Sequence, residues 1–287
     1  NSFQREFIEG MDDNVRSKIL GDESINHPTN WSFGNKGEIH ALLIVLAKEK
    51  EILKDLLANQ EKHRATHGIT LIKELDANLL QDNKEHFGFV DGISNPRIEG
   101  VHAKTEKGMR EQLFLKPGEF ILGYKNEYNN YSPMPKTDWT HANATKLNAI
   151  GILNSDVYCE NEEYLFGKNG TYLVFRQMSQ YVDRFWNYNY NKGGTEDAAI
   201  KLASKMVGRW PNGSPITKYK NRNAPKNIEK DTDNIFLYFK QDQAGAGCPL
   251  GAHVRRANPR DQLITETNNF NAGQVIRKKQ MIRRGRT

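Results

Sequence analysis

The sequence predicts an α+β protein with two ferredoxin-like domains, because each half of the chain has a similar order of elements. In the first half, an apolar run at residues 39–47 precedes a helical pattern at 48–65 and a strand-like segment at 68–75. In the second half, a β-branched and aromatic segment at 170–178 precedes two stretches with helical spacing. Each half therefore resembles part of a split βαβ unit, and the repeat predicts duplicated α+β domains that face each other.

In the first half, residues 1–38 are loop-rich, and residues 39–47 have the length and apolar character of a buried strand. Residues 48–65 carry leucine and isoleucine at helical spacing. Residues 68–75 alternate apolar and polar side chains, as a strand does.

The remaining elements are expected as follows: a short strand at 116–124, a surface loop at 128–139, a strand at 170–178, helices at 182–188 and 195–206, and either a short strand or a pocket-lining loop at 234–240. We place the domain boundary between residues 140 and 141, which gives domains at 1–140 and 141–287.

The composition is that of a globular protein that does not span a membrane: 37% of the 287 residues are hydrophobic and 26% are charged. No apolar run is long enough to cross a bilayer. The net charge of +6 invites a nucleic-acid-binding hypothesis, but the basic excess is concentrated between residues 255 and 286. Cys159 and Cys248 form neither a zinc pattern nor a disulfide framework.

A single histidine, His253, lies in the stretch Gly247-Cys-Pro-Leu-Gly-Ala-His-Val-Arg-Arg. Glycine and proline before it predict a shaped turn. Gly251 and Ala252 leave room for a flat, bulky group beside the imidazole. An imidazole near guanidinium groups suits a metal-bearing anionic cofactor such as haem. The alternative is a structural histidine in a basic loop.

A second stretch, His86-Phe-Gly-Phe-Val-Asp-Gly-Ile-Ser-Asn-Pro96, predicts a tight turn with Asp91 at its tip. Alone, it is most simply an ordinary Asp-Gly turn. Together, the two stretches resemble the dye-decolorizing peroxidase family. Gly88 to Gly92 match its Gly-x-x-Asp-Gly signature, and Cys248 to Arg260 match its proximal histidine motif.

The resemblance implies one haem b per chain, held in the C-terminal half with His253 as the iron ligand. It implies that Asp91 is the acid–base group on the opposite face, so we expect activity to favour acidic pH. It assigns Arg283, in Met281-Ile-Arg-Arg-Gly285, to stabilising charge on the departing oxygen. The alternative for Arg283 is a solvated basic tail.

Further cofactor contacts are expected from the turn residues Gly92, Ile93 and Ser94, and from two arginines. Arg176 and Arg255 are candidates for haem propionates, with a surface ion pair as the alternative for Arg176. The family's acidic partner of the proximal histidine lies beyond the distal arginine, and no match is found before Thr287. Relatives are usually longer, so we expect a truncated chain.

The sequence thus predicts a haem peroxidase that reduces hydrogen peroxide and oxidises an organic donor. The alternatives are a haem-binding or porphyrin-processing protein without turnover, and a basic nucleic-acid-binding protein. Among partners, we expect no nucleic acid and no membrane, and an oligomer is possible. The compartment is not determined; a cytoplasmic location is favoured because no signal peptide is visible.

Overall fold

The computed structural model describes residues 3–35, 39–78, 80–102, 114–138, 163–165, 167–221, 234, 236–262, 280–283 and 285. The chain divides into two compact units, Phe3–Asp76 and Ala77–Thr287. The predicted boundary between residues 140 and 141 lies outside the described residues and stays a prediction.

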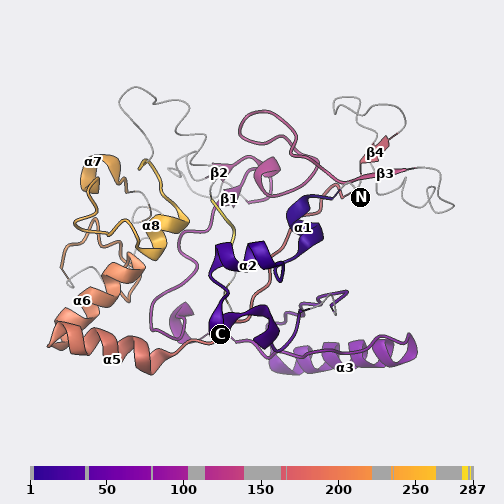
Figure 1. The fold of residues 1–287 in the computed structure, drawn as a ribbon, viewed down its shortest axis with the longest axis horizontal. Helices are drawn as coiled ribbons and strands as arrows, with labels where there is room; N and C mark the ends of the chain where they lie inside the picture. Colours follow the sequence, from indigo (N-terminus) through magenta and orange to yellow (C-terminus); the bar gives the residue numbers. More distant parts are fainter. Residues whose placement is uncertain are drawn as a thin grey trace. The chain divides into compact units, whose positions relative to one another are not determined.

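The first unit contains α1 (Arg5–Glu9), α2 (Asn14–Leu20), 3-10 turns at Ser24–Asn26 and Pro28–Asn30, and the long α3 (Lys50–Thr66) (Figure 1). The helix α3 confirms the helical pattern at 48–65. The strands predicted at 39–47 and 68–75 are wrong, because both segments are irregular and largely exposed. A strand needs a hydrogen-bonded neighbour and a cover for its apolar face, and the described residues supply neither to these segments.

The described residues of the second unit form two small sheets and four helices. Its elements are β1 (Arg97–Ile98), β2 (Phe114–Leu115), β3 (Lys136–Asp138), β4 (Glu163–Leu165), α5 (Val182–Gly193), α6 (Glu196–Val207), α7 (Phe239–Asp242) and α8 (His253–Ala257), with 3-10 turns at Gln81–Asn83 and Pro117–Glu119. The pair β1–β2 is parallel and the pair β3–β4 is antiparallel.

Two helix predictions in this unit are confirmed, and the strand predictions at 116–124 and 170–178 are wrong. The helices at 182–188 and 195–206 correspond to α5 and α6. The segment 170–178 is irregular and exposed instead of a strand, and 116–124 contains a 3-10 turn. The segment 234–240 runs into α7, because Phe239 begins a helix.

The main hydrophobic core of the second unit joins α6 to the segment that leads into α8. It comprises Ile200, Trp210, Ile216, Phe236, Tyr238, Cys248, Ala252 and Val254. Gly208, which ends α6, has a φ of +95°, and a Cβ atom there would lie 3.1 Å from the Val254 Cβ atom and 3.2 Å from the Cys248 Sγ atom. Only glycine permits this close approach, which seats the start of α8 directly on α6.

Among the described residues, no helix has both the length and the apolar character needed to cross a bilayer.

Candidate functional site

Asp91 lies at the end of a tight turn and not at its tip, where the sequence predicts it. Gly88 and Gly92 have φ values of +93° and +77°, a conformation that glycine adopts without strain. The Asp91 amide donates to the Asn83 carbonyl oxygen at 2.9 Å, which closes the turn. The Asp91 side chain is exposed, so its carboxylate is accessible to a small molecule.

Hydrogen bonds attach the turn to α5 and to the segment that follows α6. Trp186 on α5 donates its indole N–H to the Phe87 carbonyl oxygen at 3.1 Å. The Val90 amide donates to the Pro211 carbonyl oxygen at 3.1 Å, and the Phe89 side chain is buried. The backbone beside Asp91 is therefore fixed to the segment that follows α6.

His253 is the first residue of α8, immediately after the predicted turn. The Ala252 amide donates to the Pro249 carbonyl oxygen at 2.9 Å, which confirms a shaped turn before the histidine. The flanking Ala252 and Val254 side chains are buried in the core, whereas His253 itself is exposed. Its backbone is thus anchored while its ring faces outward.

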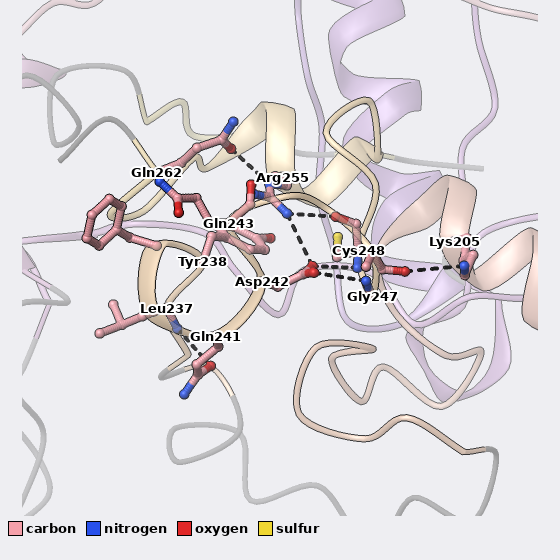
Figure 2. Close-up of polar contacts among 12 residues, drawn as sticks. Lys205, Leu237, Tyr238, Gln241, Asp242, Gln243, Gly247, Cys248, Arg255 and Gln262 are labelled. Atoms are coloured by element: carbon pink, nitrogen blue, oxygen red, sulfur yellow. Dashed lines mark hydrogen bonds and ion pairs between the residues drawn. The ribbon is translucent and has the colours of Figure 1, made fainter. Parts of the chain in front are cut away.

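Arg255 anchors α8 from the inside (Figure 2). Its guanidinium forms an ion pair with the Asp242 carboxylate at 3.2 Å and donates to the Cys248 carbonyl oxygen at 2.7 Å. It also donates to the Gln243 carbonyl oxygen and the Gln262 side chain. The Arg255 side chain has no exposed surface. This placement argues against the propionate contact expected from the sequence and gives Arg255 a structural role.

The segment that carries Arg283 joins the two predicted motifs. The Arg283 Nη1 atom lies 2.7 Å from the His253 Nε2 atom. The Arg283 amide donates to the Asn95 side-chain oxygen at 3.2 Å, just beyond the Asp91 turn. A Cβ atom on Gly285 would lie 3.1 Å from the Asp91 Oδ2 atom. His253, Arg283 and Asp91, predicted from three distant stretches, therefore meet at one place.

Partial burial lowers the pKa of His253 below its ordinary value of 6.5, and the neighbouring Arg283 cation lowers it further. The carboxylates of Asp91 and Glu85 act in the opposite direction. The net effect favours the neutral imidazole, whose nitrogen lone pair can bind a metal once the contact with Arg283 opens.

The residues at this site fit a haem better than a bare metal ion. Among the described residues, no three His, Cys, Asp or Glu side chains form a cluster that could hold a metal. One imidazole can still serve as an axial ligand to iron that a porphyrin already holds. A Cβ atom on Gly251, two residues before His253, would meet nothing within 4 Å, so the turn that precedes the histidine is open on this side. The contact between Arg283 and His253 has to open before a flat group can lie between them.

The other predicted cofactor contacts lie in two places. Gly92, Ile93 and Ser94 follow Asp91 in the turn, and Ser94 is half-buried. Arg176 lies on the exposed, irregular segment near residues 171–180, and its proposed role stays a prediction.

Sequence reasoning missed the polar side chains that hold the Asp91 turn in place. They are Asn95, Arg209, Asn234 and Arg260. The Asn-Pro sequence after the turn could have indicated Asn95. The other three lie in different parts of the chain, and no local spacing connects them.

No protein-family model matches the chain, but known proteins do. It is 27% identical to a dye-decolorizing peroxidase of Mycena epipterygia over 264 residues, which cover 85% of this chain and 44% of that protein. It is also 27% identical to the dye-decolorizing peroxidase msp1 of Mycetinis scorodonius over 257 residues, covering 86% and 44%. A crystal structure of a decolorizing peroxidase from Auricularia auricula-judae matches 73% of this chain and 43% of that chain, with 25% identity and a TM-score of 0.52.

Over most of its length the chain is therefore similar to dye-decolorizing peroxidases. It spans about 44% of the length of these curated peroxidases. The structural match supports the predicted α+β class, although the described part of the chain contains only two two-stranded sheets.

Proposed function

We propose that the chain forms the haem-binding part of a peroxidase that reduces hydrogen peroxide and oxidises an organic donor. The observation that carries this proposal is the meeting of the His253 imidazole, the Arg283 guanidinium and the Asp91 turn. One haem b per chain and duplicated ferredoxin-like domains complete the proposal. The similarity of the chain to dye-decolorizing peroxidases supports it.

Each residue has a separate task in the proposed reaction. His253 supplies a neutral nitrogen to the iron. Haem, when bound, supplies the iron at which peroxide is reduced and the electrons for that reduction. The Asp91 carboxylate accepts a proton from one peroxide oxygen and returns it to the other, departing oxygen. The Arg283 guanidinium stabilises the negative charge on that oxygen.

The test combines haemin titration with peroxide kinetics. Haemin added to the chain should produce a Soret band, and His253→Ala should abolish the band or shift it. Asp91→Asn should bind haemin normally but slow its reaction with peroxide roughly 100-fold or more, because the acid–base group is lost.

Asp183→Asn, which neutralises an exposed carboxylate at the start of α5, is the matched control and should react as fast as the wild type. Normal haemin binding with an unchanged peroxide rate in Asp91→Asn would indicate a haem carrier instead of a peroxidase. Failure of the wild type to bind haemin would refute the proposal for this chain.

A further inference from the structure

The Asp91 turn is held from behind by a polar cluster that the proposed reaction does not use. The cluster comprises Ser94, Arg209, Asn234 and Arg260. Ser94 lies three residues after Asp91, Arg209 follows α6, and Arg260 follows α8. Side chains from distant parts of the sequence therefore meet beside the turn.

Asn234 is the centre of this cluster. Its Oδ1 atom accepts from the Arg209 guanidinium at 3.0 Å, from the Arg260 guanidinium at 3.0 Å and from the Ser94 hydroxyl at 3.1 Å. The Asn234 residue is 9% exposed, so water does not replace these donors readily. Hydrogen bonds with charged donors at a buried acceptor are stronger than neutral ones.

The same side-chain amide also forms a hydrogen bond with the backbone of the turn. The Asn234 Nδ2 atom donates to the Ile93 carbonyl oxygen at 3.4 Å. The two cations require the amide oxygen to face them, which turns the amide nitrogen toward Ile93. Asparagine can accept from the arginines and donate to Ile93 at once, whereas aspartate can only accept.

Arg209 and Arg260 are themselves fixed, so the cluster is rigid. Arg209 donates to the Gly213 carbonyl oxygen at 2.7 Å and to the Ser94 hydroxyl at 2.7 Å. Arg260 donates to the Asn234 carbonyl oxygen at 2.7 Å. Both guanidiniums also lie over the Phe236 ring, at 3.8 Å for Arg260 and 5.7 Å for Arg209, in the geometry of cation–π contacts.

We propose that Asn234 is a positioning residue that sets the place of the Asp91 carboxylate by holding Ile93 and Ser94 against Arg209 and Arg260. This inference rests on the proposed function. Proton transfer depends steeply on distance, so a shift of the turn by about 1 Å can reduce the rate roughly 100-fold. His253 is anchored separately by the core and by Arg255, so loss of Asn234 leaves the iron ligand in place.

The test compares Asn234→Ala with Asn234→Asp in the whole chain. Asn234→Ala removes both the acceptor and the donor. Asn234→Asp keeps the acceptor for the arginines but cannot donate to Ile93. Asn130→Ala, which changes an exposed asparagine of the same unit, is the matched control.

The first measurement is hydrogen–deuterium exchange of residues 89–95 without haemin. Both Asn234 variants should exchange these amides roughly tenfold faster than the wild type and the control, because the turn opens more often. Asn234→Asp should nevertheless melt close to the wild-type temperature, since it keeps the contacts with the arginines. Wild-type exchange in Asn234→Ala would overturn the inference.

The second measurement is made at equal haem occupancy. Both Asn234 variants should bind haemin within about threefold of the wild type but react with peroxide at least tenfold more slowly. Equal losses of haemin binding and peroxide rate in both variants would indicate a general folding role and refute the inference. Full recovery of the rate in Asn234→Asp would also refute it, because the bond to Ile93 would then be dispensable.

Failure of the proposed function can be told apart from failure of the inference. If the proposed function is wrong, the wild type does not bind haemin, or Asp91→Asn reacts with peroxide as fast as the wild type. If the inference is wrong, the Asn234 variants keep the exchange rate of the wild type, whatever the haem chemistry.

Discussion

The core around α6 and α8 and the segment at residues 171–178 are both rich in large apolar side chains, but only the core buries them. Ile200 in the core is 8% exposed, whereas Leu173 in the segment is 67% exposed. Helix α6 satisfies its backbone hydrogen bonds internally, so its sequence needs only a surface to pack on. A strand depends on neighbours from elsewhere in the chain. Apolar content alone therefore does not determine which parts of this chain form a core.

The largest effect is expected at the buried ion pair on the core side. Arg255→Ala leaves the Asp242 carboxylate, which is 8% exposed, without its cation. Loss of one partner from a buried pair typically costs about 3–5 kcal/mol of unfolding free energy. Chemical denaturation measures this loss.

The control is Arg5→Ala, which breaks an exposed ion pair with Glu9 and should leave the denaturation midpoint unchanged. If Arg255→Ala were as stable as this control, the amides of Gly247 and Cys248 alone would satisfy Asp242.

A matched pair of truncations tests the contrast between the core and the segment directly. Ile200→Ala and Leu173→Ala each remove three carbon atoms. Ile200→Ala should lower the unfolding free energy of the protein by about 2–5 kcal/mol, since a buried cavity remains. Leu173→Ala, at an exposed position, should lower it by at most about 0.5 kcal/mol. Equal losses by denaturation would show that the segment at 171–178 is buried in solution, and the contrast would disappear.

The smallest expected effect is on the pKa of His253, at the edge of the core. Burial and the Arg283 cation lower the pKa of His253, so NMR of the haem-free chain should show it titrating below pH 6.5. Arg283→Gln removes the cation and should raise the pKa. Because the folded protein disfavours protonation, the chain loses stability as the pH falls from 6.5 through the folded pKa. An unchanged pKa in Arg283→Gln would show that the two side chains do not meet in solution.

The helices and the turns near Asp91 and His253 could be predicted because their signals are local. Leucine and isoleucine at helical spacing mark α3, Gly194 and Gly208 end α5 and α6, and the two turns are visible as glycine and proline patterns. The strands could not be predicted, because a strand requires partners that apolar periodicity does not identify.

The role of Asn234 and the direction of the Arg255 side chain could not be predicted from the sequence. Asn234 accepts from two arginines and a serine that are distant in the chain, so their meeting is a product of the tertiary fold. Arg255 lies two residues after His253, as a cofactor ligand could, yet its side chain points into the protein. The sequence spacing indicated that Arg255 lies near the site, but it did not indicate which way the side chain points.

Gly208 is a position at which this protein tolerates few substitutions. A Cβ atom there would lie 3.1 Å from the Val254 Cβ atom and 3.2 Å from the Cys248 Sγ atom, and Val254 is the neighbour of His253. A side chain at this position would press on Val254 and Cys248 at the start of α8 and would strain a backbone conformation that glycine adopts readily. A single added methyl group at this buried point therefore acts on the residue next to His253, whereas substitutions at exposed positions around His253 do not meet this obstacle.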